Sequence, residues 1–230
     1  MNSYLIDSVF FGAVISLAAY EAGLLIKRKF RLAILNPLLI ATVCVMAALT
    51  LLKIEYKHYN EGAKYISYLL TPATVCLAVP LYQQLELLRR NLKAVAVGIT
   101  SGVLASLASV FLLAKLFSLT HEQYVTLLPK SITTAIGMGV SEELGGISTI
   151  TVAVIIVTGI LGNVIAESVF KIFRIEEPIA KGLALGTASH AIGTAKAMEL
   201  GEVEGAMSSL AIAVAGLMTV VGASLFANLM

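Results

Sequence analysis

The chain has 230 residues, of which 58% are hydrophobic and only 13% are charged, and its formal net charge is +2. Because soluble domains carry about 25% charged residues, this composition excludes a soluble globular protein and indicates a protein with several membrane-spanning helices. A spanning helix takes about 20 apolar residues, so the length leaves no room for a separate soluble domain.

Six apolar runs are long enough to cross a bilayer, and two weaker apolar stretches are interrupted by glycine and polar residues. The six runs lie at 4–26, 32–52, 65–85, 94–117, 147–169 and 205–229, and the interrupted stretches lie at 129–146 and 179–202. We therefore expect an all-α polytopic membrane protein with about six full transmembrane helices and two re-entrant or broken-helix segments.

Proline and glycine predict breaks in several of these helices. Asn36 and Pro37 lie early in the second run, and Pro72 and Pro80 lie inside the third. A proline within a helix removes a hydrogen bond and clashes with the preceding turn, so a straight helix is not expected there. Gly137 is expected to break the first interrupted stretch.

Short basic connections predict the orientation of the chain. Clusters of lysine and arginine follow the first, third and fifth runs, at 27–31, 89–93 and 171–181. The positive-inside rule places these clusters in the cytoplasm and the N-terminus outside. Since the fourth run then ends outside and the fifth must end inside, 129–146 is expected to enter the membrane and return without crossing it.

The two interrupted stretches resemble each other. The segment AIGMGVSEELGG (135–146) aligns with AIGTAKAMELGE (191–202), with six of twelve positions identical. If both segments are re-entrant they enter from opposite faces, which is the inverted repeat of many secondary transporters. If both span the membrane, the copies run parallel and this inference does not follow. The repeat suggests an N-terminal scaffold unit, 1–117, and a C-terminal transport unit, 118–230.

Polar side chains gather in the interrupted stretches. Helices broken within the membrane would present unpaired backbone N–H groups and positive dipole ends, which bind anions, and a lysine facing such a cavity would suit a small carboxylate. The predicted binding residues are Ser131, Thr133, Thr134, Thr187, Ser189, His190, Gly193, Thr194 and Lys196.

Each ionisable candidate also has a structural interpretation. Lys130 is a second candidate cation, but its side chain could instead extend to the outer membrane boundary. Lys196 could simply pair with Glu199 one helical turn away. His190, Glu143 and Glu199 are candidates for proton coupling, although a structural histidine and capping or exposed glutamates are equally compatible with the sequence.

Several other functions are not expected. His58 and His121 lie in loops predicted on the opposite face from His190, so no metal site is predicted, and no cofactor is implied. Ser189 neighbours His190, but adjacent helical residues do not face each other. The G-x-S-x-G elbow is also absent, so an enzyme is not expected. Nothing in the charge distribution indicates nucleic-acid binding.

Several motifs resemble the LrgB/CidB family of bacterial membrane proteins over nearly the whole chain. They are LNPLLIA, PATVCLAVPLYQQ, LLPKSITTAIGM and GLALGTASHAIGTAKAMELGEVEGAMSSLA. The resemblance implies a multi-pass protein of the bacterial cell (inner) membrane. Ala135 stands where many members have proline, and Lys196 stands where many have arginine, whose planar fork matches a carboxylate better than lysine does. These departures bear on the substrate more than on the fold.

The resemblance implies two alternative functions. A plant chloroplast relative carries glycolate and glycerate and bacterial members are linked to pyruvate transport, which suggests a carrier of small monocarboxylates such as pyruvate, glycolate, glycerate or lactate. The family is also described as modulating murein hydrolase export and cell lysis with the small holin-like partners LrgA and CidA. The clustered hydroxyl groups favour the carrier.

The expected partners follow from these interpretations. They are membrane lipid, a small carboxylate anion and an LrgA/CidA-like small membrane protein. A homodimer is also expected, because the stretch 205–216 is rich in alanine, glycine and serine and could pack closely against a neighbouring helix.

Overall fold

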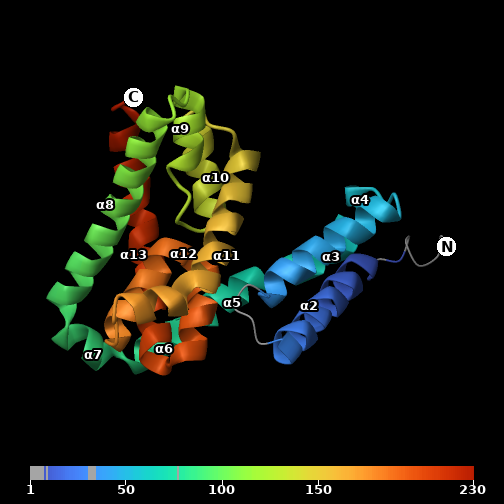
Figure 1. Cartoon of the computed structure of the whole chain (residues 1–230), viewed down its shortest axis with the longest axis horizontal. Coiled ribbons are helices and arrows are strands. Elements are labelled where there is room, and N and C mark those ends of the chain that lie inside the picture. Colours follow the sequence, from blue (N-terminus) through green and yellow to red (C-terminus); the bar gives the residue numbers. More distant parts are fainter. Residues whose placement is uncertain (1–7, 9, 31–34, 77) are drawn as a thin grey trace. The chain divides into compact units, whose positions relative to one another are not determined.

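The computed structural model of the protein describes residues 8, 10–30, 35–76 and 78–230. All regular structure in this part of the chain is α-helical (Figure 1), which confirms the all-α part of the predicted fold. The chain divides into two compact units, Met1–Cys76 and Leu77–Met230. The division predicted at 117/118 concerns functional units rather than compactness, and it stays a prediction.

The first unit is held together by close contacts between short helices. Gly23 faces the backbone of Pro37, and Gly12 faces the backbone of Tyr59, where a β-carbon would collide with main-chain atoms. Ser16 Oγ also lies 2.9 Å from Tyr59 Oη. The described helices of this unit are α2 (Phe11–Phe30), α3 (Pro37–Leu51), α4 (Tyr56–Ser67) and α5 (Leu70–Cys76).

The predicted breaks of the second and third runs lie at helix beginnings. Asn36 caps α3, and its Oδ1 accepts hydrogen bonds from the backbone N–H groups of Leu38 and Leu39, at 2.8 and 3.4 Å. Pro72 and Pro80 each lie in the first turn of a short helix, where the missing N–H group has no intrahelical partner to lose. The run 65–85 is therefore divided among several helices instead of forming one.

The second unit contains the long apolar helices. Three described helices are long and apolar enough to cross a membrane, namely α8, α11 and α13, and α3 is a shorter apolar helix. The described residues therefore contain fewer such helices than the six runs, and the exact number of spans stays a prediction. The helices of this unit are α6 (Ala78–Gln83), α7 (Leu85–Arg90), α8 (Leu92–Leu116), α9 (His121–Leu127), α10 (Thr134–Glu143), α11 (Ser148–Ile172), α12 (Pro178–Leu200) and α13 (Glu202–Ala227).

Helices α8 and α13 share the main apolar core, and their C-terminal ends lie beside α9 (Figure 1). Tyr124 of α9 is fully buried there, and its hydroxyl donates a 2.9 Å hydrogen bond to the carbonyl of Phe226. At the opposite end of α8, Asn91, which precedes α8, and Glu177, which precedes α12, line one cavity. The basic connections before α8 and α12 therefore lie at one common end, as the positive-inside rule requires.

Residues 127–146 form a loop whose two ends lie together at Thr126, and we call this loop the first hairpin. The backbone N–H of Ile147 donates to Thr126 Oγ1 at 2.8 Å. Thr151 Oγ1 donates to the Thr126 carbonyl at 2.9 Å and shares a 2.7 Å hydrogen bond with Ser141 Oγ. The helix in this hairpin, α10, has only ten residues. It is about 15 Å long, half of what a bilayer core of about 30 Å requires.

Residues 178–200 form α12 and also turn back, and we call them the second hairpin. The helix is broken at His190, whose φ of 42° and ψ of −133° are not helical. Gly193 consequently lies against the Leu185 carbonyl. The two ends of the hairpin also lie close together. An ideal β-carbon on Gly182, near the start of the hairpin, would lie 2.5 Å from the carbonyl oxygen of Glu204, which follows its end. The interruption predicted in 179–202 is therefore present, at the histidine.

The two hairpins open at opposite ends of α11, and their turns meet near its middle. The first hairpin opens beside Thr151 at the N-terminal end of α11, whereas Lys196 of the second contacts Glu167 near the C-terminal end. Ile155 lies between the two turns: an added β-carbon at Gly137 would collide with its side chain, and His190 Nε2 donates to its carbonyl at 3.0 Å.

This packing corrects one sequence-based expectation and bears on another. Gly137 does not break a helix, because it lies inside α10 and is buried against the end of the Ile155 side chain, which an added β-carbon would displace. The close helix packing expected of 205–216 is made largely with α12 of the same chain, and the homodimer stays a prediction.

Candidate functional site

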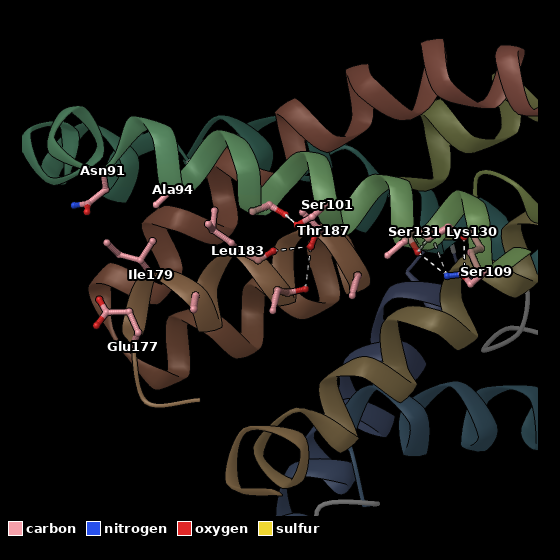
Figure 2. Close-up of a pocket in the computed structure, with 17 residues that line it drawn as sticks. Asn91, Ala94, Ser101, Ser109, Lys130, Ser131, Glu177, Ile179, Leu183 and Thr187 are labelled. Atoms are coloured by element: carbon pink, nitrogen blue, oxygen red, sulfur yellow. Dashed lines mark hydrogen bonds between the residues drawn. The ribbon is translucent and has the colours of Figure 1, made fainter. Parts of the chain in front are cut away.

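A cavity of about 800 Å³ lies between α8, the turn of the first hairpin and the first half of α12. Figure 2 shows Asn91 and Glu177 at one end and Lys130, Ser131 and Ser109 at the other. Its volume lies in the range of small-molecule sites. The only lysine among its lining residues is Lys130.

Lys130 is held at the inner end of the cavity by two serines. Its Nζ donates to Ser131 Oγ at 3.0 Å and to Ser106 Oγ at 3.2 Å, while Ser106 Oγ donates to Ser131 Oγ at 3.1 Å. Within the described part of the chain, no carboxylate forms an ion pair with Lys130. The ammonium group is therefore half-buried among neutral oxygens, with its charge uncompensated.

The α12 wall is formed by Thr187 and small residues around it. Thr187 Oγ1 donates to the Leu183 carbonyl at 2.7 Å, which holds the side chain against its own helix. Gly102 and Gly98 of α8 face Thr187 and Leu183, and their ideal β-carbons would lie 2.9 and 3.0 Å from these side chains. The two helices approach this closely only because α8 presents glycine.

Seven of the nine predicted binding residues lie outside the lining of this cavity, and four of these seven pack inside the second hairpin. His190 and Ser189 are buried against α11, where Ser189 faces Gly162. Thr194 is fully buried, and its hydroxyl donates to the His190 carbonyl at 3.0 Å and shares a 2.7 Å hydrogen bond with Ser208. Gly193 provides the close return of the chain. These residues hold the second hairpin in place.

The predicted lysine of the second hairpin is engaged in ion pairs. Lys196 Nζ lies 2.6 Å from Glu167 Oε1 of α11 and 3.2 Å from Glu199 Oε2, so the pairing with Glu199 expected as an alternative is present. Its side chain is only 13% exposed. Glu143 and Glu199 both lie at the ends of returning helices and are exposed.

Thr133 and Thr134 lie at the N-terminus of α10, directly after the turn that carries Ser131. Both are half-buried, and Thr133 makes no capping hydrogen bond through its side chain. The structure thus brings Ser131 and Thr187 into one cavity, with these threonines beside it. In the described residues, no group of three or more His, Cys, Asp or Glu side chains could hold a metal ion.

Sequence reasoning missed the contribution of α8, which was interpreted only as a spanning helix. Its cavity face is made of small residues at 94, 98, 101, 102, 105, 106 and 109. Spacings of three and four residues place these positions on one helical face. A face of serine, glycine and alanine in an otherwise bulky apolar helix was the available signal.

Comparisons with known proteins agree with the sequence motifs. The sequence profile described as the LrgB-like family matches residues 16–229. Two curated relatives are named "Antiholin-like protein LrgB", one from Bacillus cereus (strain B4264) and one from Bacillus anthracis (strain CDC 684 / NRRL 3495). Each is 40% identical over 218 residues, covering 94% of this chain and 95% of the relative.

No solved structure matches the chain. The relatives and the long apolar helices fit a multi-pass bacterial membrane protein. The chain belongs to the LrgB-like family.

Proposed function

We propose that the protein carries a small carboxylate anion across the membrane and binds it at Lys130. The observation that supports this most directly is the half-buried ammonium group, which is surrounded by hydroxyl groups and has no carboxylate partner among the described residues. A charge held away from water is costly unless an opposite charge compensates it. A bound carboxylate would supply that charge and accept hydrogen bonds from the lysine and the neighbouring serines.

The two hairpins support a carrier mechanism. Their opposite openings and their meeting point at Ile155 are what an inverted repeat predicts, and secondary transporters bind substrate where such repeats meet. In this proposal both hairpins are re-entrant. The cavity lies between α8 of the predicted scaffold unit and both hairpins of the predicted transport unit. A movement of one unit against the other would therefore open and close the binding site.

The cavity also suggests from which side the anion enters. The end of the cavity away from Lys130 is lined by Asn91 and Glu177. It lies beside the basic connections that the positive-inside rule assigns to the cytoplasm. On the opposite side, Tyr124, Phe111 and Phe226 form an aromatic cluster beyond the first hairpin. The described conformation corresponds in this proposal to a carrier open to the cytoplasm.

The names of the relatives favour a second function. They describe antiholin-like proteins, and in this function the chain would restrain a holin-like pore through contact with an LrgA/CidA-like partner and so modulate murein hydrolase export and cell lysis. The comparisons support this function more directly than they support transport. It requires an association surface but no unpaired lysine in a cavity, so the two functions can be separated by mutating the lysine.

The test is uptake of labelled pyruvate, glycolate and lactate into proteoliposomes, with and without a pH gradient. Lys130→Met is expected to weaken apparent affinity roughly 10- to 100-fold, the value of a hydrogen bond to a charged group. Lys196→Met is the matched control, because it removes the same charge from a lysine outside the cavity lining.

Each outcome assigns the function differently. Loss of affinity in Lys130→Met alone supports the proposed site. Loss in Lys196→Met alone would move the site to the second hairpin, as the sequence predicted. No uptake by the unmutated protein, with or without a small holin-like partner, would refute autonomous transport. Suppression of a holin-like pore by both variants would then support the antiholin-like function.

A further inference from the structure

A second hollow lies where α11 ends and α12 begins, and it shares no lining residue with the cavity of Lys130. Its volume is about 470 Å³. Three cations line it, Lys171, Arg174 and Lys181, and they converge because the connection between the two helices is short. We call this hollow the basic hollow.

The charge of the basic hollow is not neutralised from within. Among the residues that the structure describes, none of the three cations forms an ion pair. Two glutamates also line the hollow, but Glu167 is engaged by Lys196 at 2.6 Å. Glu176 remains as the only other carboxylate among its lining residues. The hollow therefore has an excess of positive charge suited to a phosphate group.

The surroundings of the basic hollow are apolar. Phe170, Ile175 and Leu200 form part of its wall. Ile172 and Phe173, at the end of α11, are 73% and 70% exposed. Since α11 has 25 residues, about five more than a span requires, a membrane centred on the helix would place its end at the depth of the lipid headgroups. Large exposed apolar side chains beside unpaired cations at this depth match a lipid better than a soluble anion.

We propose that the basic hollow binds the headgroup of an anionic phospholipid, such as phosphatidylglycerol, from the cytoplasmic leaflet. The phosphate contacts the three cations, and the acyl chains lie against Ile172 and Phe173. The hollow includes Lys181 from the beginning of the second hairpin and Leu200 from its end. A bound lipid therefore touches both arms of the hairpin where it opens and stabilises their pairing.

The test is native mass spectrometry of the full chain in neutral detergent, titrated with phosphatidylglycerol or phosphatidylcholine. The triple variant Lys171→Gln/Arg174→Gln/Lys181→Gln is expected to bind phosphatidylglycerol roughly 100-fold more weakly, because each cation near an anionic lipid contributes about a factor of five. The single variant Lys171→Gln changes an exposed side chain, and its affinity for phosphatidylglycerol is expected to fall about five-fold. This variant tests the proposal even if the triple variant does not fold.

A matched control removes the same charge from the other basic connection of this end, by Arg89→Gln/Arg90→Gln/Lys93→Gln. This variant is expected to retain phosphatidylglycerol binding. Equal losses in both triple variants would overturn the proposal, since they would indicate general attraction to the basic surface. Equal binding of both lipids would overturn it as well. Displacement of phosphatidylglycerol by millimolar glycerol 3-phosphate would identify a site for a soluble phosphate instead.

Discussion

Replacing Gly186 by alanine tests how the second hairpin is held against α13. An ideal β-carbon at this position lies 2.5 Å from the Ser208 carbonyl oxygen, 2.7 Å from the Ala211 β-carbon and 3.0 Å from the Ser208 α-carbon. Two of these three atoms belong to the backbone of a long helix, so no side chain can rotate to make room. The first half of α12 must therefore move away from α13.

The size of the effect follows from two opposing contributions. An extra methyl group in a close-packed interior costs about 1–3 kcal/mol, and more where the backbone must move. Alanine is also the better helix former, which returns about 1 kcal/mol. We expect Gly186→Ala to lower the free energy of unfolding by roughly 2 kcal/mol or more. Thr187 should move with the helix, so uptake should fall as well.

Gly139→Ala is the matched control, because Gly139 lies in α10 and nothing stands within 4 Å of its ideal β-carbon. Here only the gain in helix propensity applies, up to about 1 kcal/mol. Helix content measured by circular dichroism during titration with a denaturing detergent gives both free energies. A Gly186→Ala variant as stable as the Gly139→Ala variant would refute the described packing of α12 on α13.

Two further variants probe the fold. Thr194→Val should lower the free energy of unfolding by about 1–3 kcal/mol, because it leaves the buried Ser208 hydroxyl without its 2.7 Å partner. Adding Ser208→Ala should recover part of this loss. A double variant less stable than the sum of both single changes would contradict this prediction. Asn36→Ala should cost about 1 kcal/mol by removing the cap of α3, whereas Asn36→Ser keeps a capping oxygen. The same unfolding titration measures both, and equal stability of the two Asn36 variants would contradict the capping role.

The interrupted stretches were predictable because their signals are local. Gly and polar residues within apolar runs disfavour a straight membrane helix wherever the rest of the chain lies. The position of the second break was less accessible. His190 adopts a φ of 42°, a conformation that favours glycine, and the surrounding contacts with α11 maintain it. No local rule would select a histidine for that position.

The candidate site depended on contacts between distant residues. Lys196 and Lys130 were both plausible cations in the sequence, and their neighbours distinguish them. Lys196 meets Glu167 from a different helix, whereas Lys130 meets Ser106, which lies 24 residues earlier in the chain. Hydropathy and spacing report on one element at a time, so neither could show which lysine keeps an unpaired charge.

Composition and hydropathy alone determined that this chain is an all-α membrane protein with interrupted segments, because transfer to a bilayer depends on side-chain polarity summed along one helix. Tertiary structure alone decided that Ser131 and Thr187 face one cavity while His190 and Thr194 turn to neighbouring helices. The physical reason is that a polar group within an apolar protein must find a partner, and only the packing of α8, α11 and α13 around the hairpins determines which partner lies within reach.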